Sequence, residues 1–217
     1  MNATLVLLMG WLAFSGSHLL LSSTGVRPQL VARLGLKGYR LLFMAIAFGT
    51  FVPLCIYYAG HRHLGPLLWT PAPYSLVGVA VFAAFFLLVA SLFTPTAAGM
   101  MGDSTEVQGI NRISRHPAFA AMVLWAIAHM SINPWASDLV FFGGFVVQLA
   151  IGPYLMDRRI LAARGTDYQA FLDQTSYLPF AGKVKPKIVL AEYSAWVIPA
   201  TIALFALTAK IHYELLK

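Results

Sequence analysis

Long apolar segments alternate with short polar segments along almost the whole chain. Six apolar segments span about 3–22, 41–58, 75–93, 116–133, 139–156 and 193–209. A helix that crosses the hydrocarbon core of a bilayer needs about 20 apolar residues, and the fourth segment is short for such a helix. The pattern therefore predicts an all-α protein, a polytopic membrane helix bundle of about six transmembrane helices in a single domain over residues 1–217.

Lysine and arginine collect in the polar segments 23–40, 94–115 and 157–187. These hold four, two and six basic residues, twelve of the fifteen in the chain. Because basic residues favour the cytoplasmic side of a membrane, we expect all three segments in the cytoplasm and both termini outside. Pro28 and three glycines indicate that 23–40 is an irregular loop.

Two local patterns predict packing details. Tyr168, Phe171 and Leu172 have the i, i+3, i+4 spacing of a short helix lying on the membrane surface. Gly143 and Gly144 stand together in the fifth apolar segment, where small residues let another helix approach closely.

Composition excludes several classes of protein. The chain is 59% hydrophobic and only 11% charged, which is not the composition of a water-soluble domain. The net charge of +7 is explained by the basic loops, so we expect membrane lipids rather than nucleic acid as partners. The single cysteine, Cys55, lies in an apolar segment, which excludes an intramolecular disulfide and a cysteine metal cluster.

Three histidines lie within or at the edge of apolar segments. His18 is near the end of the first segment, and His116 and His129 stand at the two ends of the fourth, with Arg115 in front. A buried imidazole is costly in lipid without a partner, and neutral imidazole is a common ligand of metals and haem iron. A hydrogen bond to a neighbouring helix is the alternative explanation for each of them.

The other histidines give weaker signals. His61 and His63 flank Arg62 without a third ligand, which favours a solvated turn over a metal site. His212, near the C-terminus, is expected at the membrane interface.

Charged and aromatic residues gather around the fourth segment and after the fifth. Arg112 and Arg115 could bind a haem propionate, another cofactor carboxylate or lipid phosphate, or they could be ordinary cytoplasmic anchors. Asp157, followed by two arginines, predicts a salt-bridged helix end. Tyr168 and Tyr177 are expected to dock the surface helix.

Four segments together resemble one family: GSHLLLSS at 16–23, RLGLKGYRLLF at 33–43, RHPAFAAMVLWAIAHMSINP at 115–134 and RGTDYQAFLDQTSYLPF at 164–180. They resemble the NnrU proteins, bacterial membrane proteins linked to denitrification and nitric oxide metabolism. NnrU is in turn similar to the plant 15-cis-zeta-carotene isomerase, a haem b membrane enzyme. The RHP segment and the tail also resemble isoprenylcysteine carboxyl methyltransferases.

The resemblance implies a bacterial inner-membrane protein that binds haem b and acts as an isomerase or redox enzyme on an apolar small molecule. It implies His18 and His129 as ligands of the haem iron and His116 as the shared RHP histidine. Arg112 and Arg115 are candidate cofactor-binding residues because of their position before the fourth segment. The expected topology, however, puts His18 in the cytoplasmic half and level with His116, while His129 lies nearer the outside. The pairing of the histidines therefore stays open.

Two other functions stay open as well. An S-adenosylmethionine-dependent methyltransferase would need glutamates after the fifth helix, where this chain has Asp157-Arg158-Arg159. A non-catalytic role, as a transporter or an accessory subunit, leaves no signature in the sequence. The substrate and the oligomeric state are not readable from the residues.

Overall fold

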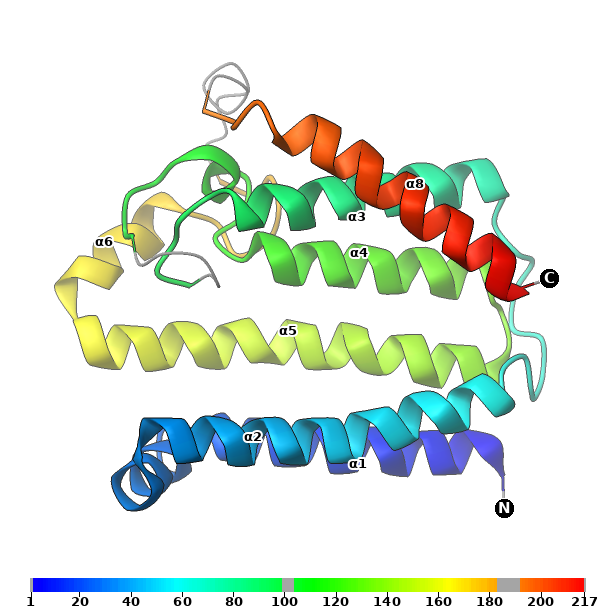
Figure 1. Cartoon of the computed structure of the whole chain (residues 1–217), viewed down its shortest axis with the longest axis horizontal. Coiled ribbons are helices and arrows are strands. Elements are labelled where there is room, and N and C mark those ends of the chain that lie inside the picture. Colours follow the sequence, from blue (N-terminus) through cyan, green and yellow to red (C-terminus); the bar gives the residue numbers. More distant parts are fainter. Residues whose placement is uncertain (1, 99–103, 183–191, 217) are drawn as a thin grey trace. The chain divides into compact units, whose positions relative to one another are not determined.

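The structure is a computed structural model that describes residues 2–98, 104–182 and 192–216. The chain is all-α, as predicted, and the described residues form seven α-helices and one 3₁₀ helix (Figure 1). The elements are α1 (Ala3–Ser22), α2 (Val26–Gly60), α3 (Tyr74–Leu92), η1 (Gly109–Arg112), α4 (Pro117–Ile132), α5 (Ala136–Arg164), α6 (Thr166–Gln174) and α8 (Val197–Leu216). The basic residues Lys183, Lys185 and Lys187 lie outside the described residues.

Each predicted apolar segment corresponds to a helix. Among the described residues α1, α2, α3 and α5 are long and apolar enough to cross a membrane, and α4 is a shorter apolar helix of 16 residues. The last segment forms α8, which carries Lys210 and Glu214 near its end. The prediction of a helical membrane protein is confirmed.

The prediction of an irregular loop at 23–40 is wrong. α2 begins at Val26, and only Gly35 departs from helical geometry within it, with φ 69° and ψ 166°. Pro28 lies in the first turn, where the backbone N–H that proline lacks would have no helical partner. The segment is therefore a short helix that bends at Gly35 into the long apolar part of α2.

The prediction of a polar connection from Asp157 onward is also partly wrong. α5 does not end with the apolar segment but continues to Arg164. Gly165, with φ 58°, then turns the chain. The predicted short helix follows as α6, and Tyr168 and Phe171 are its buried residues. Their spacing places both rings on one face, which anchors α6.

The chain divides into two compact units. Unit 1 comprises Met1–Pro73 and His129–Leu155, and unit 2 comprises Tyr74–Ala128 and Met156–Lys217. In unit 1, α1 packs along α2, with Gly10 lying directly against Leu54. On the same helix Trp11 is buried between rings from α2 and α5, and the absent side chain of Gly144 makes room for its indole.

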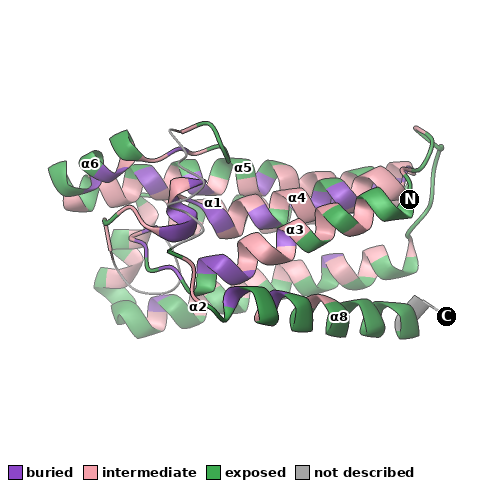
Figure 2. Ribbon diagram, turned by 90° about the horizontal axis from the view of Figure 1, so that it is seen from above, coloured by how far each residue is buried: buried purple, intermediate pink, exposed green. Residues whose placement is uncertain are grey.

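The core of unit 2 lies where α3 meets α8 and η1. Its buried residues are Val89, Ala90, Ile110, Ile113 and Val197. The outward surface of α8 is apolar but exposed, with Ile198, Ile202 and Leu207 all more than half exposed (Figure 2). An apolar surface that contacts no other part of its unit is what a membrane protein presents to lipid tails.

Candidate functional site

A buried carboxylate in unit 2, Asp157, accepts hydrogen bonds from three side chains. Arg115 Nε lies 2.8 Å from Oδ2, His116 Nε2 lies 2.8 Å from Oδ1, and the Tyr168 hydroxyl lies 2.6 Å from Oδ1. The carboxylate is 7% exposed, and a charge so little exposed to water is stable only when it is paired and hydrogen-bonded. We call Arg115, His116, Asp157 and Tyr168 the Asp157 cluster.

Three separate parts of the chain build this cluster. Arg115 and His116 immediately precede α4, Asp157 lies in the part of α5 that belongs to unit 2, and Tyr168 lies in α6. The segment after α6 fixes their positions, because the Arg115 backbone N–H donates to the Ser176 carbonyl at 2.9 Å. The Arg115 guanidinium also donates to the carbonyl of Thr175.

His116 has one ring nitrogen without a partner. Its Nε2 donates to Asp157, so the neutral ring carries a lone pair on Nδ1. Nδ1 is buried and has no hydrogen-bond partner among the described residues, and the whole residue is only 3% exposed. Buried polar atoms are nearly always satisfied, so this nitrogen is available for a donor, a proton or a metal ion.

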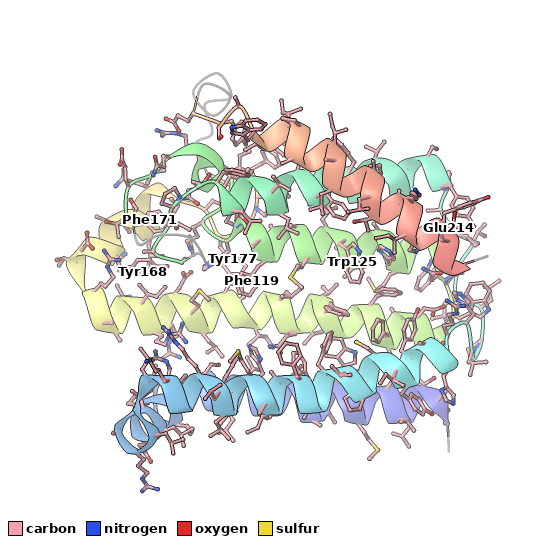
Figure 3. All side chains as sticks on the ribbon, in the orientation of Figure 1. Phe119, Trp125, Tyr168, Phe171, Tyr177 and Glu214 are labelled. Carbon is pink, nitrogen blue, oxygen red and sulfur yellow. The ribbon has the colours of Figure 1, made fainter. Side chains whose placement is uncertain are left out.

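Aromatic rings surround the imidazole. Phe119 and Tyr177 each lie with their ring centroid 5.8 Å from that of His116, and Figure 3 shows Phe119, Tyr168 and Tyr177 near the start of α4. Burial, followed by the hydrogen bond to Asp157, raises the pKa of the Tyr168 phenol. Tyr168 is therefore a fixed hydrogen-bond donor, and Asp157 can hold His116 in one tautomer and orientation.

Arg112 belongs to a different ion pair. Its Nε and Nη2 donate to the two oxygens of Glu192 at 2.8 and 2.7 Å, and the Gly109 N–H donates to the same carboxylate. The hydrogen bond from Arg112 lowers the pKa of Glu192, and the same bond raises the pKa of Arg112. The sequence placed Arg112 beside Arg115, but the structure separates the two guanidinium groups onto two carboxylates.

His18 and His129 both belong to unit 1, and each packs against phenylalanine rings. His18 lies seven residues beyond Trp11, about 10 Å along α1. The ring centroid of His129 lies 5.2 Å from that of Phe142. Phe142 packs against Phe141, and Phe141 packs against Trp11.

The residues fit a haem only in part. The Nδ1 atom of His18 is buried without a hydrogen-bond partner among the described residues, and the rings of Phe14 and Phe43 lie beside it. An unpartnered imidazole among flat apolar rings suits a haem ligand. The two arginines expected to bind a propionate, however, are already paired with carboxylates, Arg112 with Glu192 and Arg115 with Asp157.

A second buried carboxylate was missed by the sequence reasoning. Asp138, in the first turn of α5, is fully buried and accepts hydrogen bonds from the Tyr58 hydroxyl at 2.7 Å and from His63 Nδ1 at 2.9 Å. His63 does lie in an exposed turn, as predicted, but its ring is held by this buried carboxylate. An acidic residue in an otherwise apolar hairpin was the signal that could have identified this pairing.

The predicted salt bridge of Asp157 is confirmed, but Asp157 lies inside α5 rather than at its end, and its partner is Arg115. In the part of the chain that the structure describes, no group of three or more histidine, cysteine, aspartate or glutamate residues could hold a metal ion. A methyltransferase would need glutamates where this chain has Asp157. Both oxygens of the Asp157 carboxylate already accept hydrogen bonds within the Asp157 cluster.

Comparison with known proteins gives one family. The family model described as NnrU protein matches residues 6–217. The chain is 28% identical over 193 residues to the chloroplastic 15-cis-zeta-carotene isomerase of Arabidopsis thaliana, covering 83% of the chain and 52% of that protein. It is 29% identical over 158 residues to the enzyme of the same name from Zea mays, covering 68% of the chain and 42% of that protein.

The chain thus spans about half the length of the curated relatives it matches. No solved structure matches it. The family match and these two relatives include no methyltransferase.

Proposed function

The chain belongs to the NnrU family of membrane proteins, and we propose that it is an isomerase that acts on an apolar substrate within the bacterial inner membrane. The similarity to two proteins named 15-cis-zeta-carotene isomerase supports this reaction class. One structural observation carries the proposal, namely the buried His116 with its unpartnered Nδ1, held by the Asp157 cluster. Such an imidazole can hold or donate a proton beside an apolar ligand.

Haem b is the proposed cofactor. His18 is the first candidate ligand because its Nδ1 is buried and unpartnered, and His129 is the second, as the family resemblance implies. A bound haem would supply the iron chemistry, while the protein supplies the axial ligand and an apolar surrounding. Arg112 and Arg115 are already paired with carboxylates, so a propionate would have to compete with Glu192 or Asp157.

An isomerisation assay tests the reaction class. Protein purified in mild detergent from haem-supplemented cells is mixed with 15-cis-zeta-carotene, and the geometric isomers are separated by chromatography. We expect the 15-cis isomer to disappear faster than in a protein-free control, and His116→Ala to lose most of that rate while His212→Ala keeps it. An unchanged isomer ratio with the folded wild-type protein would overturn the reaction with this substrate.

Absorption spectra of the oxidised and reduced protein test the cofactor separately. We expect a Soret band that is lost in His18→Ala, and the spectra of His116→Ala and His129→Ala then identify the second ligand. A colourless wild-type protein that is fully helical by circular dichroism would exclude haem.

A setting in denitrification or nitric oxide metabolism is a further part of the proposal, and it rests on the resemblance to NnrU alone. A strain that lacks the gene should then consume nitric oxide more slowly than its parent under denitrifying conditions. Restoring the wild-type gene should recover the rate.

A further inference from the structure

The basic residues at the start of α2 have no carboxylate of their own unit near them. Residues 1–102 contain no aspartate or glutamate, and the single acidic residue of unit 1 is Asp138. Asp138 is fully buried and bonded to Tyr58 and His63. Tyr58 lies about 20 residues beyond Lys37 in α2, which is about 30 Å along the helix.

Three of the four basic residues in this segment are exposed and free of ion pairs. Arg27 is the exception, because its guanidinium lies 5.5 Å from the centroid of the Tyr39 ring. Arg33, Lys37 and Arg40 are exposed, and they form no ion pair with any described residue. Their positive charge is therefore available to an anionic partner.

One face of α2 packs against α1. The Tyr39 hydroxyl donates to the carbonyl of Leu21 at 3.2 Å, and the ring centroid of Phe43 lies 4.7 Å from that of His18. These contacts fix the rotation of α2 about its own axis, so its opposite face points away from α1.

That opposite face carries a continuous apolar stripe. Beyond Gly35 the backbone of α2 is helical, and Leu41, Met44 and Phe48 follow one another at helical spacing. Leu41 is 65% and Phe48 is 64% exposed, and Met44 is exposed as well. We call these three residues the apolar stripe of α2.

Lys37 and Arg40 stand at the end of this stripe. Lys37 precedes Leu41 by four residues and Arg40 precedes Met44 by four, a spacing that places side chains one above the other on a helix. The two basic residues are three positions apart, so their Cβ atoms lie about 5–6 Å from each other. Leu36, beside them, is exposed too, which suits the boundary between headgroups and acyl chains better than water.

We propose that Lys37 and Arg40 bind the headgroup phosphate of one anionic phospholipid, with an acyl chain of that lipid along the apolar stripe of α2. The site is separate from the Asp157 cluster and independent of the proposed isomerase activity. Charge complementarity favours an anionic lipid over a zwitterionic one, because no carboxylate of unit 1 is near enough to neutralise the two cations. Guanidinium donates two parallel hydrogen bonds to phosphate, and lysine adds a compact charge on a long stem.

The test is native mass spectrometry of the full chain in detergent, titrated with phosphatidylglycerol or with phosphatidylcholine of identical acyl chains. We expect the first phosphatidylglycerol to bind at least tenfold more tightly than the first phosphatidylcholine. A basic residue near anionic lipid contributes about fivefold in affinity, so Lys37→Gln and Arg40→Gln should each weaken phosphatidylglycerol binding about fivefold and together about 25-fold. Binding of phosphatidylcholine should change little.

The matched control is the double variant Arg62→Gln/Lys210→Gln, which removes the same charge at two exposed positions away from the site. It should bind phosphatidylglycerol within about twofold of the wild type. Circular dichroism shows whether each variant is folded, and if the double variant at the site is not, each single variant is compared with Arg62→Gln instead.

Three results would overturn the proposal. The first is equal affinity of the wild type for the two lipids, and the second is an equal loss in the site variants and in their controls. The third is equal affinity for glycerophosphoglycerol, which has the headgroup but no acyl chains, because the apolar stripe would then contribute nothing.

Discussion

At the scale of single residues, the chemistry of this protein depends on carboxylates that lie inside it. Asp157 pairs with Arg115 and His116, and Asp138 pairs with His63, each within its own unit. Removing one member of such a group leaves the others buried without a counter-charge, which costs more than the intact group contributes.

Asp157→Ala should therefore lower the free energy of unfolding by about 3 kcal/mol or more. Three donors would lose their acceptor, and two of them are charged or chargeable. The measurement is chemical or thermal unfolding in detergent. Asp173→Ala is the control, because Asp173 is exposed and accepts only from Gln169 among the hydrogen bonds of the described residues.

Tyr168→Phe tests a single bond of the cluster. It removes the hydroxyl that donates to Asp157 but keeps the buried ring, so we expect a loss of about 2 kcal/mol, typical of a hydrogen bond to a charged group. A loss below 0.5 kcal/mol, measured in the same way, would mean that Arg115 and His116 satisfy the carboxylate without the tyrosine.

The pair of Arg112 with Glu192 predicts a dependence on pH. Folding lowers the pKa of Glu192 from its usual 4.5. The ion pair therefore stabilises the folded protein above pH 4.5, and this stabilisation is lost as the pH falls through the lower pKa that Glu192 has in the folded state. The unfolding temperature of the wild type should exceed that of Glu192→Gln at pH 7, and the difference should close below pH 4.5. A constant difference down to pH 3 would contradict the assignment.

At the scale of elements, two glycines decide how helices of unit 1 are shaped and packed. A side chain at Gly144 would overlap the Trp11 indole, whereas one at Gly143 would meet Met130 only at 3.8 Å. Gly144→Ala should therefore destabilise the protein by about 2 kcal/mol, as overpacking does, while Gly143→Ala should be nearly neutral. Unfolding of the two variants under one condition checks the difference.

Gly35 sets the bend of α2. Its φ of 69° and ψ of 166° belong to a region that is essentially restricted to glycine. Gly35→Ala should cost about 1–3 kcal/mol, although no atom lies within 4 Å of the added carbon. The control is Gly49→Ala in the same helix, which has open space and helical geometry and should be neutral or stabilising.

At the scale of the whole molecule, the distribution of basic residues predicts the orientation in the membrane. With Cys55 replaced by serine, Gln29→Cys in the basic segment should react with a membrane-impermeant maleimide only after the cells are opened. Thr70→Cys, in the exposed connection after α2, should react in intact spheroplasts. The opposite labelling pattern would show that the orientation in the membrane is the reverse of the predicted one.

The family relation belongs to the same scale. The family match over residues 6–217 includes segments of both units, so membership of the NnrU family does not depend on one motif. The tests of substrate, haem and phospholipid are separate measurements on the same preparation.

The sequence by itself determined the class of protein and the places of its helices. The length and apolarity of the segments were enough, because in lipid a chain must satisfy its backbone hydrogen bonds within each helix. It also predicted the surface helix through Tyr168 and Phe171, since their spacing follows from helix geometry. The loop at 23–40 was predicted wrongly because proline in a first turn does not stop a helix.

Only the tertiary structure decided which charged groups meet. Asp157 stands beside two arginines in the sequence but binds Arg115, 42 residues away, and Asp138 binds His63, 75 residues away. Such pairs depend on which helix faces come together, and no local sequence pattern shows which residues so far apart in the chain will meet. For the same reason only the tertiary structure shows that His116 and His63 each lie against a buried carboxylate.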